Sequence, residues 1–180
     1  LLDPDAFALA FALAPSSSPP PFAPSSSRAI KQLVRKCRAA AKPVIVATQM
    51  LESMIESPMP TRAEVSDVAN SIYEGTDAIM LSAESAAGLF PIEAVTTMNN
   101  VAIEVERDPT YTAILEASRS VQGKSVADSI VAAAREIAET TDVKAIACFT
   151  SSGTTASLTA RERPRVPIIA LTANISTARR

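Results

Sequence analysis

Hydroxyl side chains follow two short apolar runs of this sequence, where they are placed to hold or move a proton. Thr48 comes directly after residues 44–47, and Ser82 comes directly after residues 78–81. The carboxyl ends of parallel strands meet at one edge of a sheet, where loops and helix N-termini converge. Thr48 and Ser82 are therefore candidate catalytic residues. Each also has a structural reading, Thr48 as the cap of a short helix at residues 50–55 and Ser82 as a loop hydroxyl that satisfies the backbone.

Two carboxylates, Glu52 and Glu84, lie near these hydroxyls along the chain. A pair of carboxylates can act as an acid and a base, but solvated or ion-paired roles are commoner for such residues. We therefore assign neither carboxylate to catalysis.

A third hydroxyl-rich segment lies between an expected strand at residues 144–149 and an expected helix at residues 156–163. A strand, a turn of small residues and a helix N-terminus together present backbone N–H groups and a positive dipole to an anion. The segment is a candidate phosphate cradle, and a plain capped turn is the alternative. Its residues are Thr150, Ser151, Ser152, Gly153, Thr154 and Thr155.

The elements that position these residues alternate between strands and helices. Thr61 and Glu64 have the spacing of a capping box, which predicts a helix over residues 62–73. Buried strands are predicted at residues 44–47 and 78–81, and a further helix at residues 92–107. This order implies a parallel sheet with crossover helices.

The second half of the chain repeats the pattern. Ser125 is a predicted N-cap for a helix through residue 140, and residues 166–171 form the next predicted parallel strand. Apolar residues recur in that helix with helical spacing and predict its packed face. They are Val126, Ile130, Val131, Ala134, Ile137 and Ala138.

Composition argues against several functional classes. With a net charge of -2 and 4% aromatic residues, the chain has no basic, aromatic-rich stripe, so we expect no binding to nucleic acid. No apolar run is long enough to cross a membrane. Histidine is absent, which removes zinc sites and histidine-based triads from consideration. Cys37 and Cys148 lack paired spacing and are predicted to be buried free thiols in a reducing compartment.

Residues 1–27 have a different composition, with clustered proline and serine, an Ala-Leu-Phe run and no basic residue. This low-complexity segment is more typical of a linker or tail than of a barrel strand. A secretory signal lacks support because no basic region precedes the short apolar run. A misassigned sequence remains the other reading.

Three long blocks resemble the pyruvate kinase family, in that family's order. They are VATQMLESMI at residues 46–55, PTRAEVSDVANSIYEGTDAIMLSAESAAGLFPIEAV at residues 60–95, and FTSSGTTASLTARERPRVPIIALT at residues 149–172. The resemblance implies an α/β protein. Residues 28–106 would form the last two βα units of a TIM-type (β/α)8 barrel, residues 107–124 a connection, and residues 125–180 part of a separate allosteric α/β C-terminal domain.

The resemblance also implies a function in glycolysis, the cytoplasmic transfer of a phosphoryl group from phosphoenolpyruvate to ADP. In the family, hydroxyls matching Thr48 and Ser82 belong to the network that carries a proton to the enolate. The loop at residues 150–155 matches one that holds a phosphate of a sugar-phosphate or nucleotide activator. Arg62 matches a position near a subunit contact, and the family suggests a homotetramer.

The family's cofactors are Mg2+ (or Mn2+) and K+, which neutralise phosphate and carboxylate charge. Their ligands, together with six more barrel strands and a lid domain, belong to blocks that this sequence does not contain. We therefore expect the 180 residues to be inactive by themselves. A noncatalytic regulatory fragment that binds a phosphometabolite through residues 150–155 is the alternative function.

Overall fold

The structure is a computed structural model that describes residues 8–11, 26–47, 50–119 and 125–179, with side chains from residue 30 onward. This part of the chain has an α/β fold and divides into two compact units. The first unit runs to residue 118 without residues 38–42, and the second contains residues 38–42 and the residues from 119 onward. No helix in the described ranges is both long enough and apolar enough to cross a membrane.

The first unit contains a parallel three-stranded sheet in the order β1 (Ala8–Phe11), β2 (Val44–Ala47) and β3 (Ala78–Met80). The register pairs Ile45 with Ala78 and Ala47 with Met80. The two strands predicted at residues 44–47 and 78–81 are thus confirmed, the second one residue shorter. Their carboxyl ends lie next to each other at the same edge of the sheet.

Strand β1 corrects one prediction. Residues 1–27 were expected to form a linker or tail, yet Ala8–Phe11 pairs with β2 in parallel along its whole length. These four residues contain no proline, so each backbone N–H is available to the open edge of β2. The proline and serine clusters that dominated the prediction come later in the segment; residues 12–25 lie outside the described residues, and Ser26 and Ser27 already belong to helix α1 (Ser26–Ala39).

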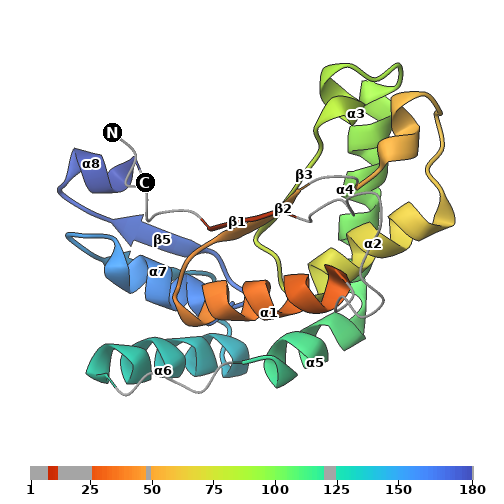
Figure 1. The fold of residues 1–180 in the computed structure, drawn as a ribbon. Helices are drawn as coiled ribbons and strands as arrows, with labels where there is room; N and C mark the ends of the chain where they lie inside the picture. Colours follow the sequence, from red (N-terminus) through yellow and green to blue (C-terminus); the bar gives the residue numbers. More distant parts are fainter. Residues whose placement is uncertain (1–7, 12–25, 48–49, 120–124, 180) are drawn as a thin grey trace. The chain divides into compact units, whose positions relative to one another are not determined.

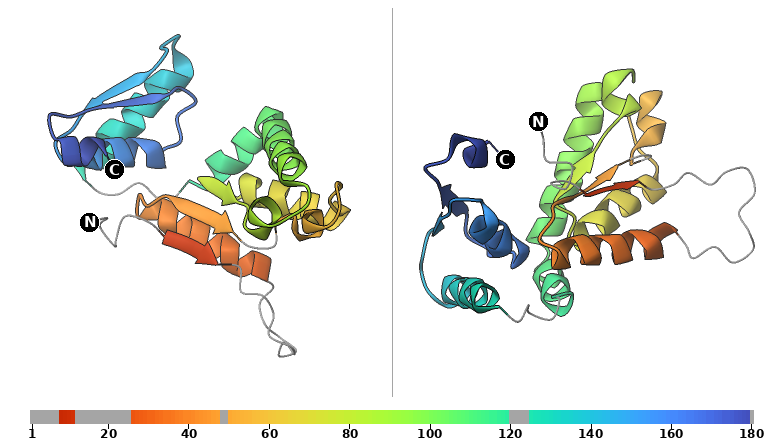
Figure 2. Two further views of the ribbon diagram at one scale, coloured as in Figure 1. Left: turned by 90° about the horizontal axis from the view of Figure 1, so that it is seen from above. Right: turned by 60° about the vertical axis from the view of Figure 1, so that its left-hand side comes forward.

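Helices α1 and α2 lie on the same face of this sheet (Figures 1 and 2). The capping box at Thr61 and Glu64 is present, and α2 has the bounds that the sequence predicts. The one-turn helix α3 was not predicted. The helices of the first unit are α1 (Ser26–Ala39), the 3-10 helix η1 (Glu52–Ile55), α2 (Arg62–Tyr73), α3 (Ala83–Ala86), α4 (Pro91–Arg107) and α5 (Pro109–Ala117).

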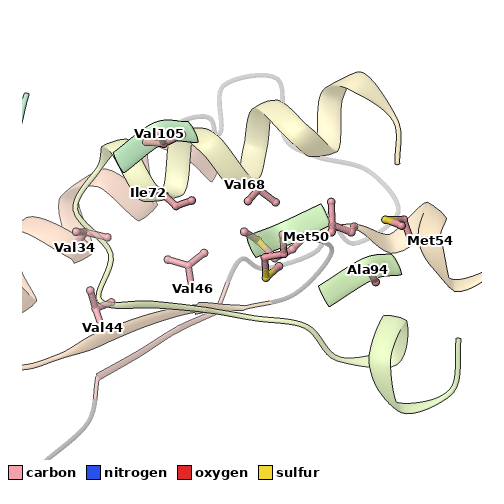
Figure 3. Packing of buried hydrophobic residues seen from close by; sticks show 11 residues of the cluster. Val34, Val44, Val46, Met50, Met54, Val68, Ile72, Ala94 and Val105 are labelled. Carbon is pink, nitrogen blue, oxygen red and sulfur yellow. The ribbon is translucent and has the colours of Figure 1, made fainter. Parts of the chain in front are cut away.

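The core of the first unit lies between the sheet and these helices (Figure 3). Val44 and Val46 of β2 point toward Val68 and Ile72 of α2, and Leu51 is fully buried. Full burial of one such side chain contributes about 1.5–3 kcal/mol. The segment that follows β2 is therefore anchored in the core, rather than lying loosely over the end of the sheet.

The second unit contains two parallel strands, β4 (Ile146–Phe149) and β5 (Ile168–Leu171). Helix α7 (Thr154–Arg161) contacts both strands and also α6 (Val126–Thr140), and the short helix α8 (Ile175–Ala178) follows β5. The predicted parallel pair and both predicted helices are confirmed, with shifted bounds. Cys148 is buried as predicted, Cys37 is half-buried, and the two are not joined by a disulfide.

The packed face predicted for α6 is wrong for three of its six residues. Val126, Ile130 and Ile137 are 77%, 61% and 55% exposed, and the buried positions instead form the opposite face of the helix. Helix α7 contacts α6, and an ion pair between Arg161 of α7 and Asp128 lies on the buried face, which apolar periodicity does not reveal. The buried residues are Asp128, Val131, Arg135 and Ala138.

Candidate functional site

The ends of β2 and β3 form the first candidate site. Ser82 lies two residues beyond β3, with an exposed side chain at the N-cap position of α3. Its side chain makes no capping hydrogen bond to this helix. Thr48 follows β2 directly in the sequence but lies outside the described residues. Leu51, not a hydroxyl residue, occupies the cap position of η1.

Glu84 connects the segments that follow the two strands. Its side chain is 3% exposed, and its carboxylate accepts the backbone N–H of Leu51 at 3.3 Å and that of Ser82 at 2.8 Å. The expectation of a solvated or ion-paired role is wrong for Glu84, because its side chain is buried and accepts two backbone N–H groups. It holds for the exposed Glu52. The sequence alone does not show that one carboxylate reaches both strand ends.

Glu64 holds the next part of the same turn. Its carboxylate accepts the backbone N–H of Ser53 at 2.7 Å, the Ser53 hydroxyl at 2.5 Å and both donors of Thr61 at 2.7 and 2.8 Å. Burial raises the pKa of Glu64, but the hydrogen bonds from Ser53 and Thr61 outweigh it and leave the pKa below its ordinary value. Glu64 therefore stays ionised and links η1 to the N-terminus of α2.

Gly88 allows the loop after α3 to approach this turn closely. A Cβ atom at Gly88 would lie 2.5 Å from the carbonyl oxygen of Glu84 and 3.2 Å from the Cα of Ile55. The next residue, Leu89, donates its N–H to the carbonyl of Ile55 at 2.8 Å. Only glycine fits this crossing of two backbones without a shift of one of them.

The donor set at these strand ends does not match a metal site. Among residues 30–47, 50–119 and 125–179 there is no group of three or more histidine, cysteine, aspartate or glutamate side chains placed to hold a metal ion. The carboxylates of Glu64 and Glu84 are already occupied by backbone and hydroxyl donors.

The loop between β4 and α7 forms the second candidate site. Thr150 is buried, donates its N–H to the carbonyl of Leu171 at 2.9 Å and accepts the N–H of Gly153 at 3.0 Å. Gly153 has a φ of +88°, and α7 begins immediately after it at Thr154, two residues earlier than predicted. The loop hydroxyls of Ser152 and Thr154 lie 2.9 Å apart and are exposed.

The loop geometry combines a buried anchor with an exposed rim. The Ser151 carbonyl accepts the hydroxyl of Thr177, which ties the loop to α8. The N-cap of α7 is glycine and so offers no side-chain oxygen to the first helical N–H groups. The Ser152 hydroxyl accepts the first helical N–H, that of Thr154, at 3.5 Å, and the positive end of the helix dipole lies beside the exposed hydroxyls of the loop.

The sequence matches two family models, one over each candidate site. The model described as "Pyruvate kinase, barrel domain" matches residues 23–95, and the model described as "Pyruvate kinase, alpha/beta domain" matches residues 128–180. The chain belongs to the pyruvate kinase family. The family resemblance noted in the sequence is thus confirmed, and both units of the structure fall within it.

Individual pyruvate kinases support the same assignment. The pyruvate kinase of Methylorubrum extorquens is 56% identical over 150 residues, which is 83% of this chain and 31% of that protein. A pyruvate kinase of Agrobacterium vitis is 50% identical over the same share of the chain. The crystal structure of a pyruvate kinase from Cryptosporidium parvum superimposes with a TM-score of 0.75 at 42% identity, over 86% of this chain and 32% of that one. The chain spans about a third of the length of these pyruvate kinases.

An ion-pair network fixes α7 within the pyruvate kinase α/β domain. Arg161, the last residue of α7, donates to Asp128 at 2.8 Å and contacts Glu162 at 3.1 Å. Glu162 in turn pairs with Arg119 at 2.9 Å. Asp128 also completes the capping box of α6 with Ser125. The network therefore joins the end of α7 to the start of α6.

This network predicts a change of stability at low pH. Hydrogen bonds from the Ser125 hydroxyl, the Arg161 guanidinium and the Ser125 backbone lower the pKa of Asp128 to about 2. Because the folded pKa is depressed, ionised Asp128 stabilises the fold above its ordinary pKa of 3.8, and this contribution is lost as the pH falls toward 2. We expect Asp128→Asn to flatten the pH dependence of thermal unfolding between pH 4 and 2. The control is Asp142→Asn, which changes an exposed carboxylate and should leave this pH dependence as in the wild type. If Asp128→Asn also leaves the pH dependence unchanged, Asp128 does not stabilise the fold through these hydrogen bonds.

Proposed function

We propose that the full-length polypeptide carrying this chain transfers a phosphoryl group from phosphoenolpyruvate to ADP, giving pyruvate and ATP. One observation carries the proposal: the chain matches the pyruvate kinase family in both of its units. The neighbouring ends of β2 and β3, with a hydroxyl residue after each, are consistent with a reaction at that edge of the sheet.

The finer fold assignment is part of this proposal. Residues 28–106 would form the last two βα units of a TIM-type barrel, with β2 and β3 as its final strands. Residues 107–124 would connect the barrel to a C-terminal allosteric domain that begins near residue 125. The support is the parallel pairing of β2 and β3, because the strands of a βα barrel are parallel. Catalytic groups of such barrels lie at the carboxyl ends of the strands, where Thr48 and Ser82 follow β2 and β3 in the sequence.

The reaction breaks the bond between phosphorus and the enol oxygen of phosphoenolpyruvate and forms a bond to a terminal phosphate oxygen of ADP. The enolate that remains needs a proton at its methylene carbon to become pyruvate. We assign that step to the hydroxyl network of Thr48 and Ser82, directly or through water. Glu84 would fix this site, because it holds the backbone at Ser82 and at Leu51.

The reaction also requires metal ions, Mg2+ or Mn2+ with K+, to neutralise phosphate and carboxylate charge. The described residues contain no group of three or more histidine, cysteine, aspartate or glutamate side chains that could hold a metal ion. We therefore propose that the metal ligands lie in parts of the polypeptide outside this chain. The proton transfer assigned to Thr48 and Ser82 does not depend on where those ligands lie.

The loop at residues 150–155 would bind a phosphate of an allosteric activator, a sugar phosphate or a nucleotide. Support comes from its exposed hydroxyls, its glycine cap and the start of α7 beside them. Buried Thr150 bonds to Leu171 of β5 and to Gly153 within the loop. These two bonds would keep the loop in the same shape when no ligand is bound. We further propose a cytoplasmic homotetramer with Arg62, an exposed residue at the start of α2, near a subunit contact.

The activator site leads to a direct test. We expect Thr154→Ala to raise the activator concentration for half-maximal activation about fivefold or more, because one donor to the phosphate is lost. Glucose 6-phosphate, fructose 1,6-bisphosphate, ribose 5-phosphate and AMP would be titrated separately. The control is Ser157→Ala, which removes an exposed hydroxyl from the next turn of α7. If Thr154→Ala and Ser157→Ala respond alike, the loop does not bind the activator.

The function itself is tested by assaying pyruvate formation from phosphoenolpyruvate and ADP with magnesium and potassium present. The full-length polypeptide is expected to turn over, and the 180-residue chain expressed alone is expected to be inactive. Turnover by the 180 residues alone would contradict our placement of the metal ligands. Absence of turnover in folded full-length protein would instead favour the noncatalytic phosphate-binding role.

A further inference from the structure

The carboxylate of Glu64 makes more bonds than its place in a helix cap requires. A capping box needs one bond from its glutamate to the backbone of the N-cap residue, here Thr61. Glu64 also accepts the N–H and the hydroxyl of Ser53, eleven residues earlier in the chain. These two bonds act between the turn after β2 and the helix α2, not within the cap.

All four donors to Glu64 come from uncharged groups: the Ser53 N–H bonds Oε1, and the Ser53 hydroxyl, the Thr61 N–H and the Thr61 hydroxyl bond Oε2. Among the described residues, no cation pairs with Glu64. A glutamine at this position would turn a donor NH2 group toward one of the N–H groups of Ser53 and Thr61. The donors of Ser53 and Thr61 therefore favour a carboxylate over an amide at position 64.

Ser53 lies in η1, inside a short segment that other groups hold at both of its ends. Glu84 accepts the N–H of Leu51, and Leu89 donates its N–H to the carbonyl of Ile55. Glu64 is the group that fixes the middle of this segment to α2. Its loss would remove the two bonds that join Ser53 to α2, whereas Met54 of η1 would stay packed in the core.

We propose that Glu64 is a positioning residue for the reaction: it holds the turn at residues 50–55, which Glu84 joins to Ser82, in the geometry needed for proton transfer. The inference rests on the proposed function. It assigns Glu64 no contact with substrate, so the expected effect falls on turnover more than on substrate affinity. A misplacement of about 1 Å near a reaction centre can lower a rate about 100-fold.

The test measures steady-state kinetics of the full-length protein with phosphoenolpyruvate and ADP. We expect Glu64→Gln to lower kcat about tenfold or more, with a smaller change in KM for phosphoenolpyruvate. Ser53→Ala removes one bond to Glu64 but leaves the helix cap, and should lower kcat about threefold. Thr61→Ala weakens the cap but leaves both Ser53 bonds, so its kcat should stay within about twofold of wild type.

The matched control is Glu93→Gln. Glu93 is also the third residue of a helix, α4, but it is exposed and its helix has no side-chain cap. Its kcat should stay within about twofold of wild type, because a surface substitution of this kind has little effect. The proposal is overturned if Glu64→Gln behaves like Glu93→Gln, or if Thr61→Ala lowers kcat as much as Glu64→Gln does.

A second readout separates this inference from the proposed function. If the wild-type protein shows no phosphoryl transfer, the proposed function fails, and amide hydrogen exchange then tests whether Glu64 holds the turn. Exchange at the Ser53 N–H should be at least about tenfold faster in Glu64→Gln than in Glu93→Gln. Equal exchange in the two variants would overturn the holding role whatever the activity.

Discussion

Replacing Thr48 by alanine in the full-length protein should lower kcat for pyruvate formation about 100-fold or more, with a smaller change in KM for phosphoenolpyruvate. The Thr48 hydroxyl is proposed to take part in protonation of the enolate. This step occurs only after the phosphoryl group has been transferred. Loss of a group that acts only in that step lowers turnover without weakening initial binding.

Proton exchange provides a sharper readout for the same variant. Wild-type protein should exchange the methyl protons of pyruvate with deuterated water, and Thr48→Ala should do so about 100-fold more slowly. Thr96→Ala is the matched control, since the Thr96 hydroxyl donates only within α4 to the carbonyl of Ile92. If Thr48→Ala keeps wild-type exchange and turnover, the residue is a structural threonine and the proton step belongs elsewhere.

Replacing Glu84 by alanine should destabilise the fold more than any other single change near the strand ends. The substitution leaves the N–H groups of Leu51 and Ser82 without their acceptor. Each buried donor left in this way costs about 1–3 kcal/mol, so we expect the free energy of unfolding to fall by about 2–5 kcal/mol. Chemical denaturation of the full-length protein measures this change.

Glu52→Ala is the control for Glu84→Ala because Glu52 lies in the same turn with an exposed side chain. Its effect should stay within about 0.5 kcal/mol. Glu84→Gln should be intermediate, since the amide keeps one acceptor oxygen for one of the two N–H groups. Equal denaturation midpoints for Glu84→Ala and Glu52→Ala would show that the two backbone bonds contribute little.

The elements with strong local signals could be predicted from the sequence. Helix α2 has the predicted bounds because the Thr61–Glu64 capping box starts it and Gly75, with a φ of +84°, follows its end. Strands β2 and β4 are short β-branched or apolar runs bounded by polar residues or turn residues. Their parallel pairing was predicted because strands alternate with helices along the sequence. In each case the deciding residues lie within a few positions of the element.

Features that depend on distant partners could not be predicted in this way. Strand β1 forms by pairing with the edge of β2, which lies more than thirty residues further along the sequence. The buried face of α6 includes the charged residues Asp128 and Arg135, and Asp128 pairs with Arg161 of α7, so this face departs from the apolar pattern. At the candidate site, the position of Ser82 followed from the strand end, but the roles of Glu84 and Glu64 required the contacts themselves.

The most direct test of the central claim follows phosphorus rather than pyruvate. Purified full-length protein is mixed with phosphoenolpyruvate, ADP, magnesium and potassium, and phosphorus NMR follows the phosphate signals. We predict that the phosphoenolpyruvate signal falls while the γ-phosphate signal of ATP rises in equal amount. If the substrate signal persists, or if it is replaced by inorganic phosphate without ATP, this protein is not a phosphotransferase between these two substrates.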